Sequence, residues 1–142
     1  MGHSLTATID ERLREVGLSA ERSIVIGSGL LDKLGIRIAE DIDLVVDDES
    51  FVSLGERTDL KRYEDDRGVH YQTNDGVIEL WRTWGLPGEA ERTYSELLPD
   101  TSVHDGVRYV TLDYLKRWKQ KKGREKDLRD MELIKRYEAM HG

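Results

Sequence analysis

The sequence predicts an α+β fold in which a small mixed β-sheet is flanked by helices. Short apolar segments rich in β-branched residues, which are typical of strands, cluster in the middle of the chain. Segments in which apolar residues recur with helical spacing lie on both sides of them. The 142 residues suit a single domain over 1–142, with its core at about 20–110 and a C-terminal helix pair at about 111–140.

The first part of the chain carries the patterns of helices and strands in alternation. Ile9, Leu13 and Val16 are spaced for one helical face, which predicts a helix over 8–16. The β-branched run at 23–26 predicts a buried strand. We then expect, in chain order, a short helix at 28–34, a strand at 42–46 and a helix or loop at 48–58.

Turn signals separate the elements that we expect in the second part. The turn at 65–68 divides two candidate paired strands, and Asn-Asp-Gly at 74–76 leads into another strand. Thr111 is a plausible N-cap for a helix that Gly123 ends. The expected elements are strands at 60–63, 69–72, 77–81 and 107–110, a helix at 94–98, and two final helices on either side of Gly123.

Composition excludes several classes of protein. The formal net charge of −7 argues against a protein that coats nucleic acid, because its overall field would repel phosphate. The absence of cysteine excludes disulfides, thiol catalysis and cysteine-based zinc or iron–sulfur sites. No apolar run approaches the roughly 18 residues of a membrane span, and no signal peptide follows Met1. We therefore expect a cytoplasmic protein without a membrane partner.

The charge is distributed unevenly along the chain. The segment 116–126 contains seven basic residues and one acidic residue. Between Glu40 and Asp66 lie eleven acidic residues and three basic ones. Such runs are usually solvated faces, but the two regions also suit a polyanion that is held partly through metal ions.

The most informative motif is local. Gly27 and Ser28 follow a buried strand, and after twelve intervening residues come Asp41 and Asp43 within the next strand. Glycine allows a ligand to approach the backbone closely, and a helix N-terminus offers free N–H groups to an anion. The two aspartates leave the same face of their strand, where a divalent cation such as magnesium can offset their repulsion. A metal site beside a phosphate cradle is typical of phosphoryl or nucleotidyl transfer.

The stretch SIVIGSGLLDKLGIRIAEDIDLVV at 23–46 resembles the signature of the polymerase-β-like nucleotidyltransferase superfamily. Its small bacterial members, the minimal and abortive-infection-type nucleotidyltransferases, are the most similar. The resemblance continues at the C-terminus, where Lys119, Gly123-Arg124, Lys126-Asp127 and Asp130 follow the pattern K…GR.KD..D. It spans about residues 20 to 140 and implies a nucleotidyltransferase-like fold.

The resemblance also implies roles for particular residues. Its third acid corresponds to Glu79, where the family often has aspartate, so that Asp41, Asp43 and Glu79 would bind two Mg²⁺ ions. Glu79 would also be the base for the attacking hydroxyl. Gly27 and Ser28 would hold the β- and γ-phosphates. Charge near the nucleotide would be neutralised by Lys119, Arg124 and Lys126. Asp127 and Asp130 would orient these basic side chains.

Lys119, Arg124 and Lys126 also have a non-functional interpretation, because a solvent-exposed helix face commonly carries such basic side chains. Arg37 lies between the two parts of the motif and can reach a phosphate or pair with Glu40. Trp81 shares a strand face with Glu79, which makes base stacking possible, although tryptophans are more often core or rim residues. The four histidines have no metal-ligand spacing.

Two classes of function follow. The first is a metal-dependent enzyme that transfers a nucleoside monophosphate from a nucleoside triphosphate, such as ATP, to a hydroxyl of a protein, an RNA end such as that of tRNA, or a small molecule. Because small members of the family are often halves of toxin–antitoxin pairs, a cognate protein is a further expected partner. The second class is a catalytically silent module that keeps the fold as an antitoxin or partner subunit. The presence of all three acids favours the enzyme.

Two other nucleotide or metal motifs fail on single residues. A dinucleotide-binding fingerprint that starts at Gly27 requires a third glycine where the chain has Asp32. A calcium-binding EF-hand loop that starts at Asp41 requires glycine where the chain has Val46.

Overall fold

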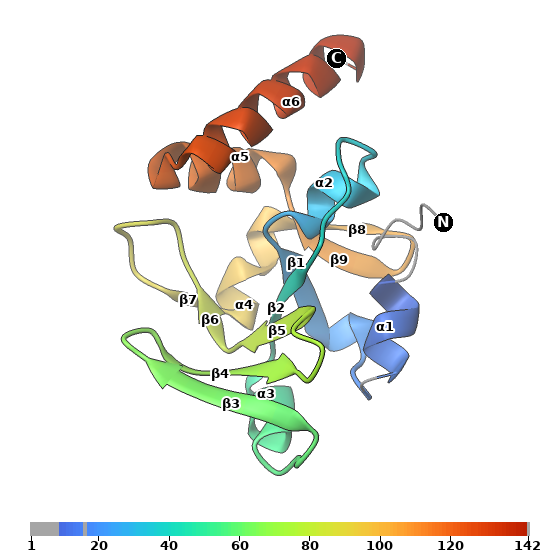
Figure 1. Cartoon of the computed structure of the whole chain (residues 1–142), viewed down its shortest axis with the longest axis vertical. Helices are drawn as coiled ribbons and strands as arrows, with labels where there is room; N and C mark the ends of the chain where they lie inside the picture. Colours follow the sequence, from blue (N-terminus) through green and yellow to red (C-terminus); the bar gives the residue numbers. More distant parts are fainter. Residues whose placement is uncertain (1–8, 16, 142) are drawn as a thin grey trace.

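The computed structural model describes residues 9–15 and 17–141, and a seven-stranded mixed β-sheet forms its centre (Figure 1). The strands lie in the order β3-β4-β5-β2-β1-β9-β8. Their bounds are β1 (Ser23–Ile26), β2 (Ile42–Val46), β3 (Leu60–Asp65), β4 (Gly68–Thr73), β5 (Ile78–Trp81), β8 (Thr101–His104) and β9 (Val107–Val110). A separate two-stranded ribbon consists of β6 (Thr83–Trp84) and β7 (Arg92–Thr93).

The sheet is mixed because two of its neighbouring pairs are parallel. Strand β1 runs antiparallel to β2 and parallel to β9, and β2 runs parallel to β5. The pairs β3–β4, β4–β5 and β8–β9 are antiparallel. The end of β1 therefore lies beside the beginnings of β2 and β5, which brings segments far apart in sequence to one edge of the sheet.

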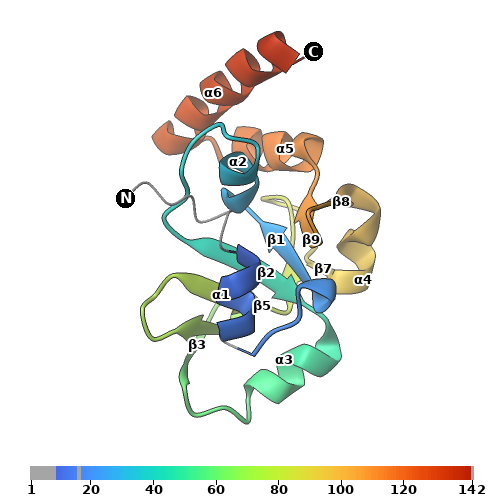
Figure 2. The same ribbon diagram turned by 90° about the vertical axis from the view of Figure 1, so that its right-hand side faces the viewer.

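Helices lie on both sides of the sheet and beyond its ends (Figures 1 and 2). The helix pair α5–α6 lies beyond the end of β1, on the side of α2, whereas α3 lies near the opposite end of the molecule. The α-helices are α1 (Ile9–Glu15), α2 (Gly29–Lys33), α3 (Asp48–Leu54), α4 (Tyr94–Leu97), α5 (Leu112–Lys122) and α6 (Glu125–His141). Two 3₁₀ turns are η2 (Ala20–Arg22) and η3 (Leu98–Asp100).

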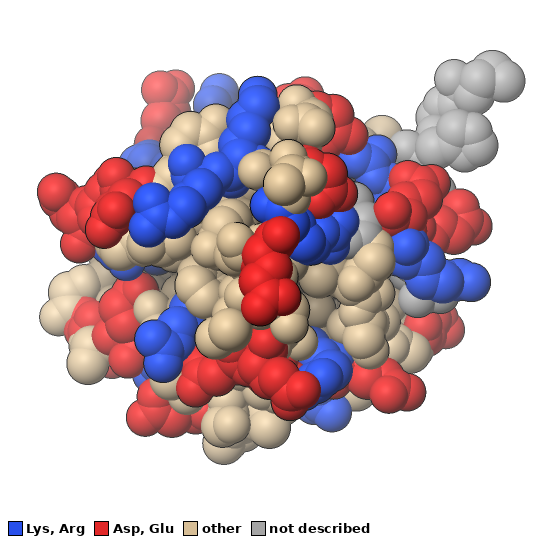
Figure 3. All heavy atoms as spheres, turned by 90° about the horizontal axis from the view of Figure 1, so that it is seen from below, with Lys and Arg blue, Asp and Glu red and all other residues tan. Residues whose placement is uncertain are grey.

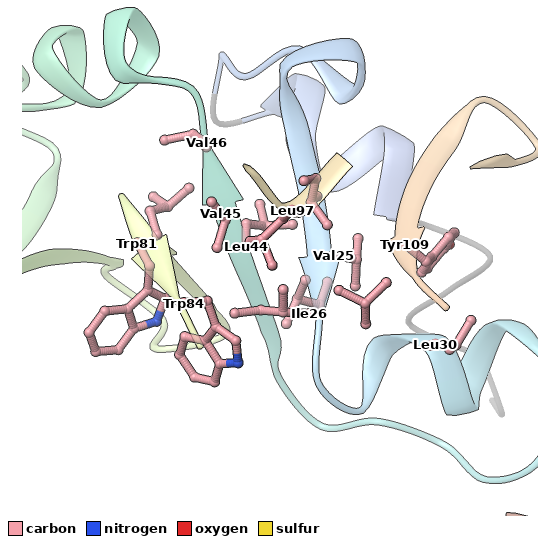
Figure 4. Packing of buried hydrophobic residues seen from close by; sticks show 14 of the residues in the cluster. Val25, Ile26, Leu30, Leu44, Val45, Val46, Trp81, Trp84, Leu97 and Tyr109 are labelled. Carbon is pink, nitrogen blue, oxygen red and sulfur yellow. The ribbon is translucent and has the colours of Figure 1, made fainter. Parts of the chain in front are cut away.

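The hydrophobic core is continuous from the central strands to the surrounding helices. Every residue of β1 is buried, as expected for a central strand that is covered on both faces. Figure 4 shows Val25 and Ile26 of β1 lying between side chains of β2 and β9, with Leu30 of α2 nearby. This packing fixes the position at which β1 ends and α2 begins.

The helix pair is defined by its caps. The Thr111 Oγ1 accepts a hydrogen bond of 3.2 Å from the backbone N–H of Tyr114, so Thr111 caps α5 as the sequence predicts. Gly123 ends α5 in the left-handed conformation, with φ at 64°, which favours glycine. The chain then reverses into α6, and the two helices pack against each other.

The structure confirms a mixed α+β architecture, and most of the predicted elements are present. The segment that the sequence left as helix or loop at 48–58 is a helix that ends at Leu54. The ribbon β6–β7 and the edge strand β8 were not predicted. Thr8 and Val16, the two ends of the first predicted helix, lie outside the described residues. Within residues 9–15 and 17–141, no helix is long and apolar enough to cross a membrane.

Candidate functional site

The turn after β1 brings the backbone close to an acidic side chain. Gly27 has φ at +72°, a left-handed conformation that is strained for other residues. A Cβ atom on Gly27 would lie 3.5 Å from the Oδ2 atom of Asp43. Ser28 comes next and precedes α2. The sequence motif Gly-Ser and the second aspartate are therefore neighbours in space.

Strand register brings the predicted acids together. Asp43 of β2 is the register partner of Ile26 on one side and of Glu79 on the other. Asp41 directly precedes β2, two residues before Asp43, and its side chain is exposed. The parallel pairing of β2 with β5 is thus the feature that brings Glu79 to the aspartates.

The three carboxylates repel one another. The pKa of Asp43 is raised from 3.8 to about 7, first by burial and then by the negative charges of Glu79 and Asp41. Positive charge on Arg67 and Lys126 opposes this effect without cancelling it. Excess negative charge at a half-buried position is typical of sites that hold a cation.

All predicted site residues line one cavity of about 490 Å³, which is within the usual size range of small-molecule sites. It lies between the helix pair and the edge of the sheet where β1 ends. The predicted residues along its wall are Gly27, Ser28, Asp41, Asp43, Glu79, Lys119, Arg124 and Lys126. Residues far apart in sequence therefore share one surface, with acids in or next to β2 and β5 and bases within or between α5 and α6.

The donor set is one that magnesium prefers, but the carboxylates do not converge. Among the residues that the structure describes, no group of three or more His, Asp or Glu side chains is placed to hold a metal ion. Carboxylate oxygens are the usual protein ligands of Mg²⁺, which often binds through one or two of them together with substrate phosphates. A metal site here requires the side chains of Asp41, Asp43 and Glu79 to turn toward a common point.

Basic and acidic residues between Lys119 and Asp130 form a buried ion-pair network. The Lys119 ammonium lies 2.8 Å from Asp130 and 3.6 Å from Asp127, and all three residues are buried. Arg124 pairs with Asp127 at 2.7 Å. Burial works against the charged form of Asp127 and Asp130, but their basic partners outweigh it, so the pKa of each is lowered. The network joins α5 to α6 directly beside the cavity.

Arg37 belongs to the same network. Its guanidinium donates to both carboxylate oxygens of Asp130, at 2.7 and 2.9 Å, and to the Ser28 Oγ at 2.8 Å. From the sequence, Arg37 could contact either a phosphate or Glu40. In the structure, its side-chain hydrogen-bond partners are Asp130 and Ser28. This contact links the turn after β1 to α6.

Lys126 lies in a different environment. Lys126 is exposed and lines the cavity. Among the described residues it has no recorded hydrogen-bond or ion-pair partner, and its charge acts on Asp43. Of the three predicted basic residues, Lys126 is therefore the one whose charge is available to a ligand.

The sequence analysis missed several residues of the site. Arg67, from the turn between β3 and β4, lines the cavity and was not singled out. Trp84 and Trp118, which we expected to be core or rim residues, line it as well. His70, to which no role was given, has its Nε2 atom 3.6 Å from Glu79 Oε1. The antiparallel pairing of β4 with β5 creates this contact, and histidine spacing in the sequence gave no signal of it.

Compared with known proteins, the chain matches no protein-family model, no curated protein and no solved structure.

Proposed function

We propose that this protein is a metal-dependent nucleotidyltransferase with a nucleotidyltransferase-like fold. The observation that carries the proposal is the strand register of Asp43 opposite Glu79, with the Gly27-Ser28 turn against the same aspartate. Asp41, Asp43 and Glu79 would hold two Mg²⁺ ions, which supply charge neutralisation at the reacting phosphate when bound. The substrate is a nucleoside triphosphate, and ATP is one candidate.

The residues of the chain divide the work of the transfer. The turn at Gly27 and Ser28 binds the β- and γ-phosphates, and Lys126 neutralises part of their charge. Glu79 accepts the proton of the acceptor hydroxyl. The acceptor oxygen then forms a bond to the α-phosphorus, while the bond from that phosphorus to the bridging oxygen of the β-phosphate breaks and pyrophosphate leaves.

The buried ion-pair network holds the residues that line the cavity in place. Arg37 orients the Ser28 hydroxyl and is itself held by Asp130. Lys119 and Asp127 tie this arrangement to the helix pair. These residues therefore position the phosphate turn, whereas Lys126 acts on the ligand directly.

Transfer of a labelled phosphate tests the proposal. The protein is incubated with each of the four nucleoside triphosphates carrying ³²P at the α-phosphate, with Mg²⁺, and with tRNA or a bacterial protein extract as acceptor. We expect label in an acceptor and release of unlabelled pyrophosphate, both lost in Asp43→Asn and retained in Lys135→Ala, an exposed change on α6 outside the cavity. Label transfer that persists in Asp43→Asn contradicts the proposal.

The alternative is a silent module of the same fold that binds a cognate protein, as in a toxin–antitoxin pair. The specific observation in its favour is that the three carboxylates are not placed to hold a metal ion in the described part of the chain. No binding of any triphosphate and no transfer to any acceptor is the outcome that supports it.

A further inference from the structure

Three tryptophan rings gather at one wall of the cavity. Trp81 and Trp84 meet edge to face, with ring centroids 5.6 Å apart, and Trp84 stacks on Trp118 at 5.9 Å. Figure 4 shows the indoles of Trp81 and Trp84 side by side, on the side of the strands away from Tyr109. All three rings line the cavity that also contains the acids.

A cation occupies the notch between two of these rings. The guanidinium carbon of Arg67 lies 4.4 Å from the ring centroid of Trp81 and 4.4 Å from that of Trp84. Arg67 comes from the turn between β3 and β4, and its side chain is 41% exposed. Its recorded ion pair, with Glu91, is long at 3.7 Å. The planar guanidinium is therefore held mainly by the two aromatic faces.

The tryptophan wall also contains an unpaired donor. Trp81 is 7% exposed, and its Nε1 atom has no hydrogen-bond partner among the described residues. An indole N–H that is buried without an acceptor is unfavourable, and buried tryptophans usually find one. The guanidinium of Arg67 has donors only, so it leaves this N–H without an acceptor.

We propose that the notch between Trp81 and Trp84 is the nucleobase subsite, and that Arg67 is a built-in competitor which a base displaces. This inference rests on the proposed function, because the same cavity would hold the triphosphate. A nucleobase is planar like a guanidinium and stacks on indole faces. Glu79 and Trp81 are two residues apart on β5, so the base lies beside the acids that act on the phosphates.

Displacement of Arg67 is compatible with its surroundings. It lies in the turn of the β3–β4 hairpin at the sheet edge, and its side chain is exposed. Its release uncovers faces of Trp81 and Trp84, which a stacked base would cover again. Its charge also acts on Asp43, so its departure leaves the acids free to attract a cation. The arginine therefore shields both the aromatic wall and the acids until a nucleotide arrives.

Intrinsic fluorescence measures this site directly, because the chain contains three tryptophans and all of them belong to the cluster. The full-length protein is titrated with adenosine, guanosine, cytidine and uridine, and separately with inorganic tripolyphosphate, in EDTA. We expect at least one nucleoside to quench the fluorescence saturably and tripolyphosphate to leave it unchanged. Nucleosides carry no phosphate, so binding reports the base subsite alone.

Variants identify the competitor. Removing a cation–π contact of this kind in Arg67→Ala should tighten nucleoside binding by about twofold to tenfold. Arg62→Ala, an exposed arginine on β3 of the same hairpin, should leave binding unchanged. Trp84→Leu should weaken it by on the order of tenfold, with retained folding verified by circular dichroism.

The outcomes separate this inference from the proposed function. Absence of quenching by any nucleoside in both the wild type and Arg67→Ala overturns the inference, as does weaker binding in Arg67→Ala. Quenching by a single-stranded oligonucleotide but by no mononucleoside also overturns it. Nucleoside binding as predicted, without phosphate transfer in the labelling experiment, leaves the subsite in place and refutes the transferase.

Discussion

Asp43 is the residue whose carboxylate is most affected by burial and by the neighbouring acids. It is half-buried, faces Gly27 and has Glu79 as its register partner. Its raised pKa means that the folded protein disfavours the charged form at neutral pH. A cation bound between Asp43 and Glu79 would offset this repulsion, as the proposed metal site expects.

We predict that Asp43→Asn stabilises the protein at pH 8. The folded-state pKa of Asp43 is about 7, above the ordinary 3.8, so wild-type stability falls as pH rises between these values. The neutral amide removes this loss, which is at most about 4 kcal/mol. Urea denaturation in EDTA at pH 8 and at pH 4 measures the difference between variant and wild type.

The difference should be largest at pH 8 and should shrink toward pH 4, where the wild-type carboxyl is protonated. Asp66→Asn, an exposed change in the hairpin turn, serves as the matched control and should show no such trend. An Asp43→Asn variant that is less stable than wild type at pH 8 contradicts this account of the site.

At the residue scale, the sequence predicted what is local. Gly27, Ser28, Asp41 and Asp43 were found because a strand, a turn and a second strand place them by short-range rules. The pairing of Arg37 with Asp130 spans 93 positions and depends on how α6 docks, which no local pattern encodes.

At the element scale, the packing of α2 against β1 positions the Gly-Ser turn. A Cβ atom on Gly29 would lie 2.6 Å from Val25 Cγ1, a distance at which something must shift. Glycine at the start of α2 is therefore required for close approach of the helix to the strand.

We predict that Gly29→Ala destabilises the protein by about 1–3 kcal/mol through overpacking. Helix propensity alone predicts the opposite sign, a gain of about 1 kcal/mol. In the Val25→Ala background, where the clashing methyl group is absent, the same substitution should cost much less. Thermal unfolding of the four proteins in this cycle gives the coupling, and additive effects would exclude the clash.

The ion-pair network is the second element-scale feature, because it holds α6 against the cavity. Asp130→Asn leaves the Lys119 ammonium buried with one fewer counter-charge, and we expect a loss of about 3–5 kcal/mol. Glu138→Gln removes the partly exposed partner of Lys116 on the same two helices and should cost less than about 1 kcal/mol. Equal losses by urea denaturation would show that burial of the network contributes nothing.

Element prediction succeeded where periodicity and caps agreed. The strands β1 and β2 and the N-cap Thr111 follow from apolar runs and a capping side chain. The two-residue strands β6 and β7 are too short to carry a period of two, and tertiary pairing alone defines them.

At the scale of the whole molecule, charge is segregated at the cavity but mixed elsewhere. Of the predicted residues that line the cavity, the acids lie at β2 and β5 and the bases at the helix pair. Asp130 of α6 and Arg67 of the β3–β4 turn also line it, so the segregation is partial. Figure 3 shows both signs interspersed over the face that carries β3, β4 and α3. Because the overall charge is −7, the proposed binding of a triphosphate would depend on the local basic residues at the cavity.

We predict that Lys126→Ala weakens triphosphate binding in a salt-dependent way. Lys126 is exposed at the cavity and has no recorded partner in the described part of the chain, so its charge acts on the ligand. We expect a loss of roughly threefold to tenfold at low ionic strength that fades as salt screens the charge. Titrations at two salt concentrations, with Lys135→Ala as the control on α6, measure it; a loss unaffected by salt would contradict an electrostatic role.

For the whole molecule, the sequence predicted the fold class but not the arrangement of the strands. Strand patterns in the middle of the chain, with helical patterns on both sides, indicated an α+β fold, but they did not give the strand order. The parallel pairing of β2 with β5 and the approach of the β3–β4 hairpin determine which residues share the cavity. The aromatic wall around Arg67 was therefore beyond the reach of motif spacing.

The central claim is that three acids and the turn after β1 form a metal-dependent triphosphate site. Calorimetric titration of ATP, GTP, CTP and UTP, with and without Mg²⁺, tests it most directly when the Asp41→Asn/Asp43→Asn variant is measured in parallel. We predict binding of at least one triphosphate that requires Mg²⁺ and that the variant loses. Binding that is unchanged by Mg²⁺ or by the double substitution, or no binding of any triphosphate, would contradict the claim.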